Sequence, residues 1–521
     1  MNKISDKIFK NTIFNALGNI FTTGIQIVII PYILLKLGTE RFGIWALVSV
    51  IFGIFTALDF GTGNAFVKYF SEYYIKKEYE NFNKALVAGF FFMLIFSLFL
   101  IFIVILLKSE LINFFNIPLH LTSESIFVFV TAAIIFGLNN TFGVFQAIIK
   151  GLQRMEITNC INVICSIIYV IGVFVVLRYG YGLKGLIVNQ GIKIVLVSMA
   201  SIFYSKKIFK SLKFRLNYFN FKQVKMILSY GIKMQISSIA NLVNLQTDKT
   251  IIGYFLNLSL VAAYEIGQKI SLFSQMILGL ALSALVPAVS ELDASGKKES
   301  ILKLYERGNK YIACFTFPVL VFLIAFTNLI INLWMGIGYE KSIFVARLLM
   351  CAVFINLLTG VGVMIVRGIG KPFYETSYAL ISLVFNIFLG VILVKSYGFS
   401  GVIIATPISV IIGSIYFIYQ FHRLYSFSFI ELATRIYLKP FLISFLGIGI
   451  LYSLNFIIAR QVLLETRFEF FILMVMNCVI FFPAVVWSLK KARYWDEEDR
   501  VLILEKVKFN PKIFKLASAI L

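Results

Sequence analysis

The sequence predicts an all-α, polytopic membrane protein with about 14 transmembrane helices. Hydrophobic residues make up 60% of the 521 residues, and only 14% are charged. The mean hydropathy is +0.91, and the charges cluster between long apolar runs. A soluble protein of this length would need far more polar residues to cover its exterior. A lipid environment accounts for both the apolar excess and the spacing of the charges.

Each crossing of a bilayer core requires roughly 20 apolar residues in a helix. The predicted spans are residues 12–37, 43–66, 84–107, 125–149, 157–178, 182–205, 227–253, 260–288, 310–335, 342–367, 374–395, 398–421, 437–459 and 469–489. Very short connections join the fifth span to the sixth and the eleventh to the twelfth, which predicts two tight helical hairpins. The first apolar run is longer than that of a signal peptide, so we expect a membrane helix there.

The formal net charge is +23. In a soluble protein this excess would indicate nucleic-acid binding, but here the cations lie in short loops beside apolar spans, as the positive-inside rule expects. Most of the cations fall on the side of the membrane on which the N-terminus is predicted to lie. Residues 206–225 are the clearest case, with seven cations and no acid. The sequence therefore predicts a multi-pass protein of the cytoplasmic (inner) cell membrane, with both termini cytoplasmic and no nucleic-acid partner.

Signatures of enzymes and metal sites are missing from the sequence. The five cysteines are isolated in apolar segments, and His120 and His422 are far apart, so no metal site is expected. There is no P-loop, no H-E-x-x-H and no G-x-S-x-G, and the predicted outer loops are too short for a catalytic domain. We therefore predict a transporter without a cofactor, driven by H+ or Na+, by the membrane potential or by the substrate gradient.

An internal repeat recurs at a spacing of about 217 residues. Residues 181–188 (YGLKGLIV) match residues 397–404 (YGFSGVII), residues 148–151 (IIKG) match residues 365–368 (IVRG), and Ser71-Glu72 matches Ser290-Glu291. Two six-helix bundles in the same orientation commonly enclose a transport cavity. The predicted domains are two six-helix lobes at residues 1–210 and 211–425, related by pseudo-two-fold symmetry, an extra two-helix unit at residues 426–490 and a cytoplasmic tail at residues 491–521.

Polar residues within the spans are costly in lipid and are therefore functional candidates. The seventh span carries a polar stripe at helical spacing, and the first, second and eighth spans add similar residues, which predicts one polar cavity with surplus cations for an anionic substrate. The predicted substrate-binding cations are Lys193, Lys233, Lys249, Lys269 and Arg347; the polar lining residues are Asn15, Asn19, Gln26, Asn241, Asn244, Gln268 and Gln275; the candidates for ion coupling are Asp59, Asp248 and Glu265.

Structural roles are open alternatives for several of these residues. Glu265 and Lys269 are four residues apart in the favourable order and could neutralise each other. Asp248 and Lys249 could pair with another helix.

Three more charges have structural alternatives of other kinds. Lys36 and Arg347 lie near helix ends and could extend to the interface. Asp59 precedes Gly61-Thr62-Gly63 and could satisfy loose backbone groups there. Lys193 and Lys233 lie deeper in their spans and have the weakest structural explanation.

Several motifs resemble a known family when they are taken in order. Residues 58–65 (LDFGTGNA) with 69–72 (YFSE), residues 38–45 (GTERFGIW), residues 150–154 (KGLQR), residues 248–255 (DKTIIGYF) with 263–266 (AYEI), and residues 286–290 (VPAVS) resemble segments of polysaccharide-unit flippases. The resemblance is to the polysaccharide transporter branch, the O-antigen type, of the multidrug/oligosaccharidyl-lipid/polysaccharide exporter superfamily. It implies two six-helix lobes and alternating access.

The same resemblance implies a function. It predicts a flippase that moves undecaprenyl-pyrophosphate-linked oligosaccharide across the cytoplasmic membrane for surface polysaccharide biosynthesis, such as lipopolysaccharide O-antigen, with membrane lipids, a polymerase and a chain-length regulator as partners and the chain itself a monomer. Many such flippases have twelve helices, whereas lipid II flippases have fourteen. The first span here has no arginine, which disfavours the lipid II type. Alternatives are a lipid II-type flippase, an ion-coupled multidrug exporter, or a membrane glycosyltransferase or polymerase.

Overall fold

The structure is a computed structural model that describes residues 2–283, 285–425, 428–459 and 466–507. Throughout these ranges the regular elements are helices, so the predicted all-α fold class is confirmed. The helices are α1 (Asn2–Leu37), α2 (Thr39–Ala57), α3 (Thr62–Ile75), α4 (Tyr79–Leu106), α5 (Lys108–Phe114), α6 (Thr122–Gly151), α7 (Met155–Arg178), α8 (Gly182–Ile208), α9 (Phe221–Phe255), α10 (Leu258–Ser283), α11 (Leu285–Ala294), α12 (Lys298–Ala325), α13 (Thr327–Met335), α14 (Glu340–Gly368), α15 (Phe373–Tyr425), α16 (Phe429–Leu432), α17 (Leu438–Ala459), α18 (Arg467–Lys491) and α19 (Glu497–Val507).

The predicted spans fall on helical structure in the described residues, but two of them are interrupted. The second span is divided between α2 and α3 and the ninth between α12 and α13, whereas α15 contains both the eleventh and the twelfth. The eighth span falls on α10 and α11, and residue 284 between them lies outside the described residues. Eleven segments of the described chain are long and apolar enough to cross a membrane, and one of them, Phe373–Tyr425, covers two predicted spans. Helices α9 and α10, which carry polar stripes, are not among the eleven. The total of 14 spans stays a prediction.

The chain divides into two compact units. The first comprises residues 1–269 and 379–409, and the second comprises residues 270–378 and 410–521. These boundaries differ from those of the predicted lobes, which rest on sequence repetition and stay a prediction. Each unit is described by itself below.

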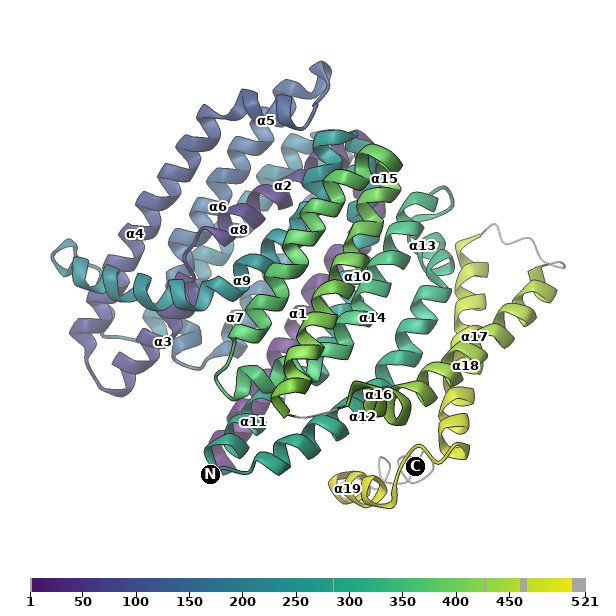
Figure 1. Cartoon of the computed structure of the whole chain (residues 1–521). Helices are drawn as coiled ribbons and strands as arrows, with labels where there is room; N and C mark the ends of the chain where they lie inside the picture. Colours follow the sequence, from purple (N-terminus) through teal and green to yellow (C-terminus); the bar gives the residue numbers. More distant parts are fainter. Residues whose placement is uncertain (1, 284, 426–427, 460–465, 508–521) are drawn as a thin grey trace. The chain divides into compact units, whose positions relative to one another are not determined.

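In the first unit, α6 is the central helix of a layer. It packs against α4 on one side and α8 on the other, as Figure 1 shows, and α7 packs against both α8 and α1. Helix α9 crosses α2, α3 and α4. Phenylalanine side chains fill the core between these helices, and Phe70, Phe82 and Phe145 are buried there.

In the second unit, α12 packs against α14 and α17, and α11 packs against α14. Helices α17 and α18 cross and contact each other (Figure 1), and α18 also contacts α13. Phe322 and Phe481 are buried in this second group of contacts, with their ring centroids 5.3 Å apart. The two C-terminal helices outside the repeat are thus packed onto α12 and α13.

Loops of the first unit gather at two opposite ends, as alternating crossings require. At the predicted outer end, His120 contacts Glu40 at 3.3 Å, and the Asn116 amide donates to the carbonyl of Tyr254. At the predicted inner end, the Tyr73 hydroxyl donates to Gln223 at 3.2 Å. Successive loops therefore fall at alternate ends, while the orientation of these ends in the cell stays a prediction.

Backbone geometry supports the internal repeat. Gly182 and Gly398, which occupy equivalent positions in the repeated motifs, have φ angles of +55° and +56°. An L-residue rarely adopts this left-handed conformation, so glycine is favoured at both turns. Each repeat also has a close helix crossing at a matching glycine: Gly151 of α6 approaches Ser71, and Gly368 of α14 approaches Val289.

Candidate functional site

The strongest candidate site is a group of four charged residues within the first unit, on α9 and α10, three of which are buried. The Lys249 side chain is 2% exposed, and its ammonium lies 2.9 Å from Glu265 Oε2. Lys269 lies 2.9 Å from the other carboxylate oxygen, Oε1. Lys249 also donates to the Ser49 hydroxyl of α2 at 2.6 Å. We call Asp248, Lys249, Glu265 and Lys269 the charge cluster.

The local sequence explains why these residues meet. Helices α9 and α10 are joined by a two-residue turn at 256–257, so residues at similar distances before and after it face each other in an antiparallel pair. Lys249 and Glu265 stand at such positions. Lys269 follows Glu265 by four residues and therefore lies on the same face of α10.

Asp248 is the second centre of the charge cluster. Its Oδ2 accepts hydrogen bonds from the Tyr264 hydroxyl at 2.7 Å and from the Thr406 hydroxyl of α15 at 2.5 Å. Asn386, also on α15, donates to the Thr406 hydroxyl at 3.0 Å. Asp248 is 1% exposed, and within the described residues neither its Oδ1 nor the Oδ1 of Asn386 has a hydrogen-bond partner.

These two buried oxygens, one on the Asp248 carboxylate and one on the Asn386 amide, are costly unless something compensates them. A proton on Asp248 would do so, because the neutral carboxyl can donate. A small hard cation would also do so, because it prefers carboxylate, amide and hydroxyl oxygens, all of which Asp248, Asn386 and Thr406 supply. The donor set therefore suits H+ or Na+.

The formal charges of the cluster balance, two cations against two anions. Lys249 and Lys269 were predicted to bind an anionic substrate, but the structure directs both ammonium groups to Glu265. The mutual neutralisation of Glu265 and Lys269, an alternative that the sequence left open, is the arrangement observed. Asp248 and Lys249 each bond to other helices, as their structural alternative expects. Substrate binding by these lysines stays a prediction.

The other predicted cations have separate surroundings. Lys193 is half-buried, with its ammonium 5.4 Å from the centroid of the Tyr169 ring. Arg347 of α14 is half-buried, and Lys36 is exposed in the last turn of α1. The exposure of Lys36 agrees with the interfacial alternative.

Asp59 has a local backbone partner. Its Oδ1 accepts a hydrogen bond from the Gly61 amide at 2.8 Å, in the break between α2 and α3. The backbone role expected as an alternative for Asp59 is therefore observed, and its role in ion coupling stays a prediction.

The predicted polar lining residues are only partly collected by the fold. Gln268 is buried and donates to the carbonyl of Leu245 at 2.9 Å, which ties α10 to α9. Asn244 is half-buried, whereas Gln26 and Gln275 are exposed. The side chains of Asn15, Asn19, Lys233 and Asn241 lie outside the described part of the chain.

Four residues beside the charge cluster were not predicted from the sequence. Ser49, Tyr264 and Thr406 bond to it directly, and Asn386 bonds to Thr406. Asn386 and Thr406 were detectable, because each is a polar residue inside an otherwise apolar predicted span. Nothing in the local pattern connected them to Asp248, which is more than 130 positions earlier in the chain.

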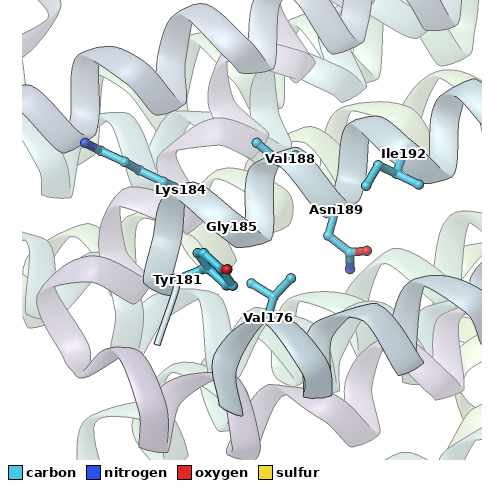
Figure 2. A pocket seen from close by; sticks show the side chains of 7 residues that line it. All are labelled: Val176, Tyr181, Lys184, Gly185, Val188, Asn189 and Ile192. Carbon is cyan, nitrogen blue, oxygen red and sulfur yellow. The ribbon is translucent and has the colours of Figure 1, made fainter. Parts of the chain in front are cut away.

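A cavity lies on the surface of α7 and α8. Figure 2 shows its lining, which is largely apolar, around a volume of about 390 Å³. It is formed by Val176, Tyr181, Lys184, Gly185, Val188, Asn189 and Ile192. None of the predicted site residues lines it. Its apolar walls suit contact with a hydrocarbon chain rather than with a sugar.

The fold is that of transporters of the multidrug/oligosaccharidyl-lipid/polysaccharide exporter superfamily. The chain is similar to lipid II flippase MurJ in an inward closed conformation, with a TM-score of 0.70 and 16% identity over 94% of this chain and 100% of that one. It is also similar to an inward-facing multidrug resistance MATE family transporter, with a TM-score of 0.64 and 15% identity over 80% of this chain and 94% of that one. At these identities the likeness establishes the fold.

Within that class, the chain belongs to the polysaccharide biosynthesis protein family, whose sequence profile matches residues 8–293. A relative named probable low-salt glycan biosynthesis flippase Agl15, from Haloferax volcanii, is 25% identical over 80% of this chain and 83% of its own length. A putative O-antigen transporter from Shigella flexneri is 23% identical over 80% of this chain and 99% of its own length. The family predicted from the motifs is therefore confirmed.

Proposed function

We propose that this protein is a flippase that moves undecaprenyl-pyrophosphate-linked oligosaccharide across the cytoplasmic membrane for surface polysaccharide assembly. The observation that carries the proposal is the family match over residues 8–293. The relatives named as a glycan flippase and an O-antigen transporter support it along most of the chain. In this mechanism the lipid tail stays in the bilayer while the sugar and pyrophosphate cross through a polar route, and alternating access exposes that route to each side in turn.

The charge cluster supplies the coupling step in this proposal. A ligand shifts a conformational equilibrium only if it binds the two states with different free energies. At Asp248, a buried carboxylate with an unpartnered oxygen, H+ or Na+ would relieve the uncompensated charge. Because Asp248 bonds to α10 and α15 as well as lying on α9, occupancy would change how tightly these three segments hold together.

Lys249, Glu265 and Lys269 have a supporting role in the same step. The ion pair between Lys249 and Glu265 holds α9 against α10 next to Asp248, and Lys269 pairs with Glu265 from the same helix. A rigid neighbouring ion pair would keep the position of Asp248 constant while H+ or Na+ binds to Asp248 and leaves it. The proposed coupling thus needs both parts of the charge cluster.

Flipping in proteoliposomes tests the coupling directly. The purified chain would be reconstituted with a fluorescent polyprenyl-pyrophosphate oligosaccharide, and flipping would be measured with Na+ or choline outside and with an imposed pH gradient. We expect the wild type to respond to one of the two ions and Asp248→Asn to lose that response. Asp293→Asn is the matched control, since this side chain is exposed and lies outside the charge cluster. Equal ion dependence in Asp248→Asn and the wild type would remove Asp248 from the mechanism.

A cellular test addresses the substrate. Lys233→Ala and Lys249→Ala would be introduced together, and surface polysaccharide would be measured in cells that depend on this chain. We expect reduced assembly at normal expression, because the predicted route loses two cations. Normal assembly would reject their assignment to the route. Efflux of cationic dyes, or sugar polymer formed by the purified protein, would instead favour an exporter or an enzyme.

A further inference from the structure

The connection between α8 and α9 forms a basic surface that the proposed transport mechanism does not use. Residues 206–225, which we call the basic strap, contain seven cations and no acid. All seven side chains are exposed: Lys206, Lys207, Lys210, Lys213, Arg215, Lys222 and Lys225. In the described part of the chain none of them joins a salt bridge. Their charge is therefore uncompensated by the protein.

Large apolar side chains are exposed on the same strap. Leu216 is 69% exposed and Phe221 is 72% exposed, and Phe214 and Phe219 are each more than 40% exposed. In water these side chains would gain by burial in an apolar medium. Cations interleaved with exposed aromatic and aliphatic residues are typical of segments that lie in the membrane interface.

The basic strap is held in a defined shape. Asn83 of α4 is buried and binds the strap backbone twice, donating to the Ser211 carbonyl at 3.1 Å and accepting from the Lys213 amide at 2.9 Å. Phe209 is buried against Phe82, with ring centroids 4.6 Å apart. The strap therefore presents its cations from a fixed support, which reduces the entropy lost on binding.

Position and charge together identify the partner. The strap connects the end of α8, which has the length and apolarity of a membrane span, to α9, so it lies where a helix leaves the hydrocarbon. We propose that the basic strap docks on anionic phospholipid headgroups at the membrane surface, with Leu216 and Phe221 entering the interface. Phosphate groups would neutralise the cations, and the acyl boundary would accept the apolar side chains, two requirements that a soluble anion cannot both meet. This inference does not depend on the proposed transport activity.

Hydrogen exchange in lipid nanodiscs tests the docking on the full chain. Backbone amide exchange in residues 211–221 would be compared in nanodiscs of phosphatidylcholine alone and with about one third phosphatidylglycerol. We expect at least threefold slower exchange with the anionic lipid, and we expect 0.5 M NaCl to abolish the difference, because the screening length falls from about 10 Å at 0.1 M salt to a few ångströms.

Two charge variants separate docking from general charge effects. Neutralising Lys206, Lys207, Lys210 and Lys213 to glutamine should remove the lipid-dependent protection. The matched control changes four exposed lysines at the predicted outer end to glutamine, Lys108, Lys184, Lys341 and Lys395, and should keep it. Equal exchange of the wild type in both lipids would overturn the proposal. Protection that appears only when a polyprenyl pyrophosphate is added would also overturn it, since the strap would then recognise substrate rather than bulk lipid.

Discussion

Replacing Glu265 with methionine should show how strongly the ion pairs of the charge cluster stabilise the protein. The substitution keeps a similar side-chain length but leaves the ammonium of Lys249 with Ser49 as its remaining described partner. Lys249 is 2% exposed, so water cannot compensate the charge. Removing one member of a buried ion pair costs about 3–5 kcal/mol, because the other charge is left unpaired.

The partner variant, Lys249→Met, should cost less. Glu265 would keep its second ion pair, to Lys269 at 2.9 Å, so no charge is left alone. The expected loss is about 2 kcal/mol, the value of one hydrogen bond to a charged group. In the double variant both buried charges disappear, and Lys269, whose side chain is 34% exposed, can reach water. The double variant should therefore be more stable than Glu265→Met alone.

A double-mutant cycle measures this difference. The free energy of unfolding of the four proteins would be obtained in detergent micelles by titration with sodium dodecyl sulfate, followed by circular dichroism. We expect a coupling energy of about 2–3 kcal/mol between residues 249 and 265, within the range for residues in direct contact. Additive losses would refute the reasoning, because they would mean that neither charge depends on the other. Equal losses for the two single variants would also refute it, because they would mean that Lys269 does not compensate Glu265 when Lys249 is removed.

Three further predictions concern other parts of the fold. Gly368→Ala should destabilise the second unit by about 1–3 kcal/mol, since a Cβ there would lie 2.6 Å from the Cβ of Val289. An unchanged melting temperature would show that α11 and α14 can move apart without loss of stability. Asn83→Ala should speed exchange of the Lys213 amide several-fold while leaving α6 protected, because that amide donates to the Asn83 side chain. Unchanged exchange at Lys213 would contradict the role of Asn83 in holding the strap. Burial alone would raise the pKa of Asp499, but hydrogen bonds from Lys310 and Tyr311 outweigh it and hold that pKa below its usual value of 3.8. Docking of α19 should therefore be stable above pH 4 and be lost as the pH falls through the lowered pKa. Asp499→Asn should show increased amide exchange in α19 already at pH 7. Equal exchange in α19 for the wild type and Asp499→Asn at pH 7 would exclude the ion pair between Lys310 and Asp499 as its anchor.

Several features of the site were predictable because they depend on neighbours in sequence. The spacing of Glu265 and Lys269 places them on one helix face, and their ion pair is observed. Asp248, Lys249 and Glu265 stood out because charges are rare within apolar spans. The contacts of each charge were not predictable from the sequence. The same pattern would have been seen whether Lys249 faced a substrate route or paired with Glu265. The surplus of cations counted along the spans also misrepresented this site, where the charges balance.

The all-α membrane class, the course of the helices and the alternation of loops followed from local composition, since about 20 apolar residues in a row are stable only as a helix in lipid. The breaks after Ala57 and Ala325 and the partners Ser49, Asn386 and Thr406 emerged only when the helices were packed. Polar groups in an apolar interior must find partners wherever the packing brings them. The partners of Asp248 on α15 lie more than 130 positions later in the chain. The periodicity of a single helix carries no information about contacts between helices so far apart in sequence.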